Sequence, residues 1–181
     1  MKYHSVRATF RNPPGFVALL VVFVFIAPGI SALSPEDLSS VAGVIRADDP
    51  EAVILEIDME SSGRGGIVTV ETNRAIEYYI GLASPEILER ERRGRMNARL
   101  ARRVAAVPDT MNLPDAYRLV LEYLAQNDRY SRVSPGDFSS IEYQIEFGRL
   151  IVEVIFDGVF GDLSVYMDPV TGEILESEWD D

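Results

Sequence analysis

The order of its periodic segments constrains the fold of this chain more than any other feature. Apolar residues at helical spacing lie between Ser34 and Pro50, and three segments follow in which apolar and polar residues alternate (52–60, 67–72 and 75–82). Helical spacing predicts an amphipathic helix, and alternation with a period of two predicts strands that bury one face. The first half of the chain therefore predicts one helix packed on an antiparallel sheet.

The second half shows the same order of segments. An amphipathic helix is expected over 115–127, and alternating segments follow at 141–147, 150–156 and 163–167. A fourth strand is expected at 173–177. The sequence thus predicts an α+β fold made of two tandem units, each a helix on an antiparallel sheet.

The first 32 residues have the features of a secretory signal peptide. A basic stretch precedes an apolar run at 16–27, and small residues end at Ala32. The twelve apolar residues of that run would reach only about 18 Å as a helix, short of the ~30 Å core of a bilayer. An uncleaved anchor helix is therefore the weaker alternative. We expect cleavage after Ala32 and an exported protein, periplasmic or secreted.

The expected mature chain lacks the residue types that most enzymes use. The single His and the single Lys, His4 and Lys2, lie in the leader, and the chain has no Cys. These absences exclude a Ser-His-Asp or Cys-His relay, a His/Cys zinc site, a Schiff base, a disulfide and a lipid-anchored cysteine. We therefore expect no enzyme and no cofactor. An enzyme that uses carboxylates alone ranks third among the alternatives.

The charge of the chain is strongly acidic, with one basic exception. Loss of the leader changes the net charge from −12 to −15, because three cations leave with it. This acidity disfavours nucleic acid and anionic membranes as main partners. However, seven arginines and two glutamates lie between Glu89 and Arg103. We expect a helix over 86–107, within an Arg-rich connecting segment at 85–109, whose arginines pair with acidic neighbours. A helix that binds anions or nucleic acid is the alternative.

The segment YMDPVTGEILES (166–177) predicts a strand, a tight turn and a second strand. Its turn residues are Asp168, Pro169, Thr171, Gly172 and Glu173. Proline fixes φ, Asp can accept local backbone N–H groups, and Gly supplies a positive φ. Aspartic-peptidase chemistry would need two Asp-Thr-Gly loops, and this segment does not supply them.

Other side chains are weaker candidates for a site. Asp157, Asp162 and Asp168 are near one another in the sequence and could hold a cation if they converged, although no metal is expected. Trp179 and Tyr166 are the candidate binding residues, and Trp179 either caps the sheet edge or is an exposed anchor. The remaining aromatic residues could line a ligand groove, but their spacing favours the core. They are Tyr78, Tyr79, Tyr117, Tyr123, Tyr143, Phe147, Phe156 and Phe160.

The second half resembles a known family. The strand LIVEVIFDG and the following VYMDPVTGEIL are similar to the PepSY domain, in which the last strand runs into an Asp-x-x-Thr-Gly-Glu turn. The resemblance covers roughly 110–178 and implies a small antiparallel sheet packed by a helix, with a binding or inhibitory role. Residues 33–84 resemble a degraded copy without the Asp and Gly of the turn. Tandem units of this kind also resemble secreted β-lactamase inhibitor proteins in architecture alone.

These observations predict four segments: a signal peptide (1–32), a degenerate PepSY-like unit (33–84), the Arg-rich connection (85–109) and a PepSY-like domain (110–181). The expected function is that of an exported, non-enzymatic binding protein. It would inhibit or chaperone another exported protein, such as a hydrolase or peptidase, through the exposed face or edge of a sheet. The alternative is an envelope protein that binds a small ligand or a cation.

Overall fold

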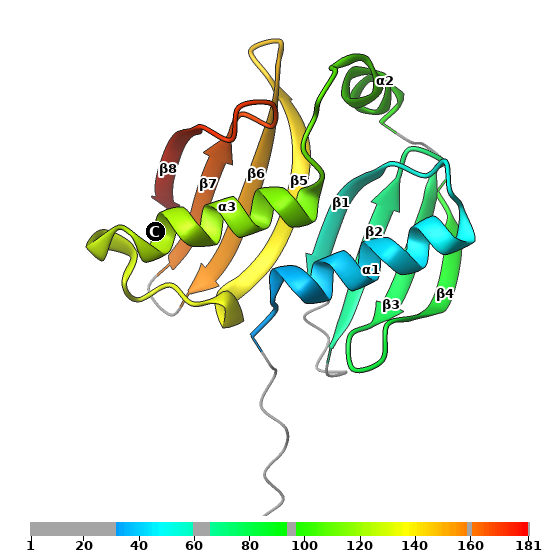
Figure 1. Ribbon diagram of the computed structural model, residues 1–181, viewed down its shortest axis with the longest axis horizontal. Helices are drawn as coiled ribbons and strands as arrows, with labels where there is room; N and C mark the ends of the chain where they lie inside the picture. Colours follow the sequence, from blue (N-terminus) through cyan, green and yellow to red (C-terminus); the bar gives the residue numbers. More distant parts are fainter. Residues whose placement is uncertain (1–31, 60–65, 94–96, 159–160, 181) are drawn as a thin grey trace, which may run out of the picture.

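The computed structural model describes residues 32–59, 66–93, 97–158 and 161–180. In these ranges the chain forms an α+β fold with three α-helices and eight strands (Figure 1). The helices are α1 (Pro35–Asp48), α2 (Ala98–Ala106) and α3 (Leu113–Ala125), with short 3-10 turns at Asp128–Tyr130 and Pro135–Asp137. The strands are β1 (Ile54–Met59), β2 (Ile67–Thr72), β3 (Ile76–Gly81), β4 (Glu86–Arg92), β5 (Phe138–Glu146), β6 (Arg149–Gly158), β7 (Gly161–Met167) and β8 (Ile174–Asp180).

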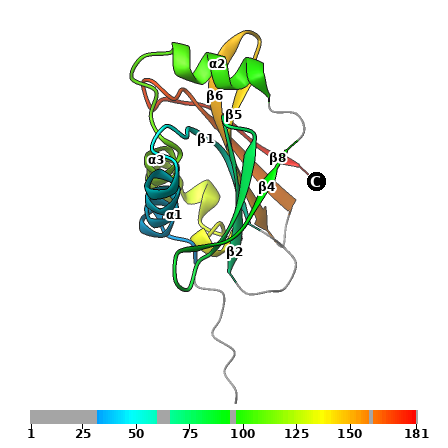
Figure 2. The same cartoon turned by 90° about the vertical axis from the view of Figure 1, so that its right-hand side faces the viewer.

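All eight strands belong to one antiparallel sheet in the order β4-β3-β2-β1-β5-β6-β7-β8. Its centre is the pairing of β1 with β5, in which Ile57 lies opposite Ile141. The helices α1 and α3 lie side by side on the same face of this sheet (Figures 1 and 2). The expected antiparallel α+β class is confirmed, and the strands of both halves form one continuous sheet.

The helix α1 begins where local chemistry favours a start. The Ser34 side chain accepts a hydrogen bond from the Asp37 backbone N–H at 3.1 Å, and the Asp37 carboxylate accepts the Ser34 N–H at 2.9 Å. This reciprocal cap satisfies two donors that a helix start leaves open. Pro35 at the first helical position has a suitable φ and lacks the N–H that would be left unpaired. The helix ends at Asp48, two residues before Pro50.

The core lies between the two helices and the face of the sheet that they cover. The Tyr117 ring of α3 packs edge-on against Phe138, with centroids 4.9 Å apart. Its hydroxyl donates to the Leu33 carbonyl at 3.1 Å, which links α3 to the segment before α1. The side chains that α1 and α3 bury in this core are Leu38, Val41, Ala42, Ile45, Leu113, Ala116, Tyr117, Val120 and Leu124.

The helix expected over 86–107 is only partly present. Residues 86–92 form the edge strand β4, and α2 begins only at Ala98. Glu, Leu and Arg have good helix propensity, which is why this segment reads as helical. The open edge of β3 supplies a hydrogen-bonding partner instead, and an edge strand tolerates charged side chains on both faces. Tertiary pairing therefore overrides local propensity here.

The helix α2 buries Leu100 and Val104 and lies at one end of the sheet, beside the segment that leads into α3 (Figure 1). Within the described ranges, no helix is both long and apolar enough to cross a bilayer. The expected signal peptide at 1–32 lies almost wholly outside the described residues, which begin at residue 32.

The turn between β7 and β8 is closed by Asp168 and Gly172. The Asp168 carboxylate accepts the N–H groups of Val170 and Thr171 at 2.8 and 3.1 Å, and these bonds, with the charge of Arg149, lower its pKa. Gly172 has φ +73°, and a Cβ built there would lie 2.8 Å from Leu119 Cδ1 of α3. The positive φ favours glycine at this position, and a Cβ there would also force the Leu119 side chain to shift.

Replacement of Gly172 by Ala should destabilise the protein by about 1–2 kcal/mol, because Ala pays the cost of a left-handed backbone. Gly43 is the matched control: it lies in α1, and a Cβ placed there would have nothing within 4 Å. Gly43→Ala should therefore stabilise the protein by about 0.5–1 kcal/mol. Urea unfolding of both variants measures the difference. Equal effects of the same sign would contradict the left-handed backbone conformation of this turn.

Candidate functional site

The two faces of the sheet have different surroundings. On β1, Leu55 and Ile57 are 2% and 0% exposed in the core under the helices. Glu56 lies between them, and successive side chains of a strand point to opposite faces, so Glu56 lies on the other face. Among the described residues, no helix or strand lies over that face (Figure 2). We call it the open face.

A row of seven glutamates and one tyrosine crosses the open face from one edge of the sheet to the other. Each member lies opposite the next in the strand register, so that all share one face. We call this set the glutamate row. It has one residue on each strand, in the order Glu91, Glu77, Glu71, Glu56, Glu142, Glu153, Tyr166 and Glu176.

Like charges crowd at the centre of the glutamate row. Neighbouring strands lie about 4.8 Å apart, so carboxylates that face each other across strands repel. Burial first, then the hydrogen bond and charge of Asp58 and the charge of Glu142, together raise the pKa of Glu56 to about 8. Burial likewise raises the pKa of Glu142. Every charged group that shifts either pKa through its charge is another carboxylate.

On β3, the negative charge of the glutamate row is balanced by a neighbouring cation and a hydroxyl group. Burial alone would raise the pKa of Glu77, but hydrogen bonds from Arg93 and Tyr79 outweigh it and lower the pKa. Arg93 forms an ion pair with Glu77, and the Tyr79 hydroxyl donates to the same carboxylate at 2.8 Å. Near the centre, the Gln144 amide donates to Glu142 at 2.7 Å. The ion pairs found within the described ranges include neither Glu56 nor Glu142.

The structure separates the two candidate binding residues. Tyr166 lies on the open face as a member of the glutamate row, and its hydroxyl donates to Glu178 at 3.1 Å. Trp179 pairs with Leu163 on the opposite face and packs against the core, so it caps the end of the sheet.

The three candidate cation ligands lie at two different places. Asp157 and Asp162 face each other across the β6–β7 pairing. Asp168 follows the far end of β7, about 20 Å along a strand from Asp162. In the part of the chain that the structure describes, no three His, Cys, Asp or Glu residues form a group that could hold a metal ion.

Most of the aromatic residues considered for a ligand groove lie in the core or against it. Tyr78, Tyr117, Tyr143 and Phe156 are at most 3% exposed. Phe160 lies outside the described residues. Phe147 is different, because 97% of its surface is exposed. The remaining Tyr79 and Tyr123 are partly buried.

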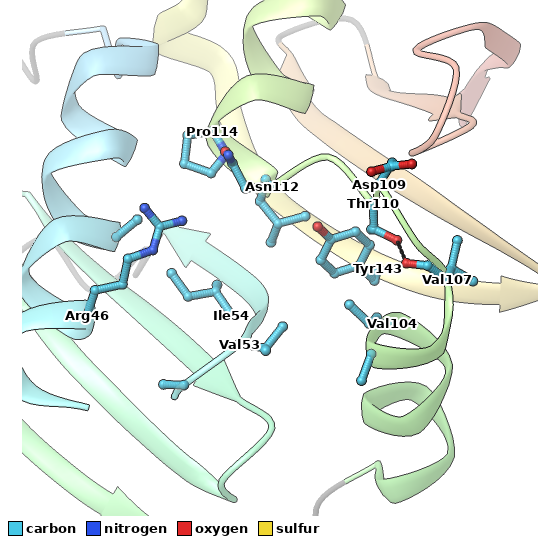
Figure 3. Close-up of a pocket in the computed structure, with 14 residues that line it drawn as sticks. Arg46, Val53, Ile54, Val104, Val107, Asp109, Thr110, Asn112, Pro114 and Tyr143 are labelled. Atoms are coloured by element: carbon cyan, nitrogen blue, oxygen red, sulfur yellow. Dashed lines mark hydrogen bonds between the residues drawn. The ribbon is translucent and has the colours of Figure 1, made fainter. Parts of the chain in front are cut away.

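A cavity of about 360 Å³ lies between α1, α2 and the segment that leads into α3 (Figure 3). Its walls are mainly apolar, and Arg46 and Asn112 are among its polar groups (Figure 3). The Thr110 hydroxyl donates to the Val107 carbonyl at 2.8 Å, and the Tyr143 hydroxyl donates to the Met111 carbonyl. No residue of the glutamate row lines this cavity. Glu56, whose pKa is raised, therefore lies on the open face of the sheet and not in the cavity.

The expected pairing of the arginines holds for only part of the segment. Arg90 pairs with Asp48, and Arg93 pairs with Glu77. The arginines of α2 behave differently, since the hydrogen bonds found for Arg102 and Arg103 go to backbone carbonyls. The cations of β4 thus tie the edge strand to its neighbours, whereas those of α2 face outward.

Comparison with known proteins assigns neither a family nor a function to this chain. No family model matches the chain, so the resemblance to the PepSY family stays a prediction. No curated protein matches it either. One similar solved structure is described as a "putative lipoprotein" of Clostridium difficile 630, with 15% identity and a TM-score of 0.49. The match covers 79% of this chain and 92% of that one.

The glutamate row should make the stability of the protein depend on pH. Glu56 has an ordinary pKa of 4.5 and a pKa of about 8 in the folded chain. Between these values the folded state keeps a proton that the unfolded state releases, so the free energy of unfolding falls as the pH rises. Glu56→Gln should flatten this slope and stabilise the protein at pH 8 by about 1–2 kcal/mol, after allowance for solvent screening.

Urea unfolding between pH 4.5 and 9 tests this expectation. Glu89→Gln is the control, because Glu89 is exposed on the edge strand β4. A Glu56→Gln variant that is less stable than the parent chain at pH 8, or that keeps the same slope, would contradict the account of charge crowding.

Proposed function

We propose that this chain is an exported, non-enzymatic binding protein that modulates another exported protein through the open face of its sheet. The glutamate row is the observation that carries the proposal. A sheet face without a helix over it is a ready surface for a partner, and its central carboxylates have no cation of their own chain within the described ranges. A partner that supplies cations would relieve this repulsion, so we infer a basic protein surface as the occupant.

The repeated order of elements supports the interpretation of two tandem PepSY-like units. One helix and four strands occur at 35–92, and the same order recurs at 113–180. With β4 included, the first unit would extend beyond residue 84 to residue 92. The connection would then consist of α2 and its flanks. On this interpretation the turn at Asp168 and Gly172 belongs to the second unit, and the first unit lacks its counterpart.

The face of the sheet suits a partner better than either edge does. The edge strand β4 carries Glu89, Arg90, Glu91 and Arg92 in succession, and all four are exposed. The other edge, β8, also carries acidic side chains. Charged edge strands resist the addition of a further strand. An inhibitor or chaperone of this architecture would therefore use side chains of the open face in preference to backbone pairing at an edge.

The alternative function is the binding of a small ligand in the cavity between α1 and α2. Its apolar walls come from both halves of the chain, and Arg46 could pair with an anionic group of a ligand. A ligand there would bridge the first half, the connection and Tyr143 of β5. Tight binding of a small molecule, lost in an Arg46→Gln variant, would favour this alternative.

Capture experiments test the main proposal. The parent chain, a Glu56→Gln/Glu142→Gln variant and a Glu36→Gln/Glu122→Gln control would be immobilised and exposed to an exported protein fraction. The control replaces the same number of glutamates on α1 and α3, and the two variants are compared at pH 8.5, where most of the Glu56 side chains are ionised. A partner that binds the open face should be retained by the parent chain and the control. We expect the open-face variant to bind it about tenfold more weakly, given about 1 kcal/mol or somewhat less per lost exposed pair.

The pH dependence of capture gives a second readout. Affinity for a basic partner should increase between pH 6 and 8.5, because Glu56 releases its proton in that range. A partner retained equally by all three chains would place its contact elsewhere. Failure to retain any partner, together with ligand binding in the α1–α2 cavity, would replace the proposal with the alternative.

A further inference from the structure

The helix α2 presents three arginines on one side. Arg99, Arg102 and Arg103 stand three and four residues apart, which places them on the same surface of a helix. The buried residues Leu100 and Val104 lie on the other side. The three arginines line one cavity together with Ala106 and with Ile145 and Gly148 of the β5–β6 hairpin.

These three arginines keep their charge uncompensated among the described residues. Arg103 Nη2 donates to the Gly148 carbonyl at 3.3 Å, and Arg102 Nε donates to the Ala98 carbonyl at 3.0 Å. None of the ion pairs found in the described ranges includes Arg99, Arg102 or Arg103. In a chain with 29 acidic residues, three neighbouring guanidinium groups without a carboxylate are unusual. Their remaining N–H groups are free to meet an anion.

The tip of the β5–β6 hairpin lies at the same end of the molecule as α2 (Figures 1 and 2), and it carries the exposed aromatic residue Phe147. Glu146 pairs with Arg149, so Phe147 and Gly148 form a two-residue turn. Both have positive φ, +46° and +81°. Such a turn favours Asn or Gly at its first position, and a bulky residue there is strained. Phe147 is nevertheless present and 97% exposed. Neither turn geometry nor packing among the described residues explains a phenylalanine at this position.

We propose that the arginine side of α2 and the tip of the β5–β6 hairpin form a binding site for a phosphate-bearing ligand with an apolar portion. The planar guanidinium group matches the oxygens of a phosphate, and three of them suit a ligand with more than one negative oxygen. Phe147 would contact the apolar portion beside the phosphate. The acidity of the rest of the chain acts weakly here, because charges beyond about 8 Å are screened at physiological salt.

This site is independent of the proposed function, because it uses the end of the molecule and not the glutamate row. A free phosphate compound and a phospholipid headgroup share the chemistry that the site would recognise. Two arms of one experiment separate them. Calorimetry measures binding of pyrophosphate to the full chain, and co-sedimentation measures binding to vesicles of phosphatidylglycerol or of phosphatidylcholine.

Matched variants identify the residues. Arg99→Gln/Arg103→Gln should weaken binding about 25-fold, at about fivefold for each arginine near an anionic surface. Arg118→Gln/Arg129→Gln removes the same charge from α3 and from the 3-10 turn that follows it, and should leave binding unchanged. Phe147→Asn should raise the melting temperature, because Asn suits the turn, and should weaken vesicle binding several-fold without a change in pyrophosphate binding.

Each outcome decides the proposal. Binding of pyrophosphate alone supports a soluble phosphate compound, and binding of phosphatidylglycerol vesicles with little binding of phosphatidylcholine supports a headgroup. Either result must depend on Arg99 and Arg103. An absence of binding in both arms, or equal losses in the two double-arginine variants, would overturn the site. Variants of Glu56 and Glu142 should not affect either arm, so this test fails or succeeds separately from the proposed function.

Discussion

The pairing of β1 with β5 is the contact on which the rest of this structure depends. It joins two four-stranded groups into a single sheet, and it places α1 and α3 side by side on one face. The same pairing sets Glu56 opposite Glu142 and thereby completes the glutamate row. Continuity of the core and crowding of charge on the open face are therefore two results of one register.

The pairing of β1 with β5 combines favourable contacts on one face with unfavourable contacts on the other. Ile57 lies opposite Ile141 in the core, and both are fully buried. On the other face of the same strands, two carboxylates are forced together, and one of them keeps its proton near neutral pH. Apolar burial of the isoleucines contributes more than repulsion costs, since a fully buried aliphatic side chain gains about 1.5–3 kcal/mol. The crowded carboxylates of the open face are therefore tolerated because apolar burial on the opposite face of the same strands stabilises the sheet.

The sequence predicts the local elements well and their assembly poorly. Capping at Ser34 and apolar spacing in α1 and α3 are local signals, and the structure follows them. The helix predicted across 86–92 was wrong, because propensity cannot reveal the open edge of β3 that captures this segment. The glutamate row was not foreseen, since it depends on the register between distant strands. The exposure of Phe147 was also missed, although Gly148 signalled the turn in which it stands.

The short register between the two halves has a mechanical consequence. The pairing of β1 with β5 joins three residue pairs, from Glu56–Glu142 to Asp58–Ser140, whereas β5 and β6 share eight. Bending of the sheet would therefore concentrate along this line, as local opening concentrates where few backbone bonds hold neighbouring units. The helices α1 and α3 contact each other near the same line, with α1 over the first half of the sheet and α3 over the second (Figure 1), and they resist bending from one side only. The sheet therefore has two more rigid halves that are joined along the more flexible β1–β5 pairing. That pairing carries Glu56 and Glu142, the most crowded carboxylates, on its open face.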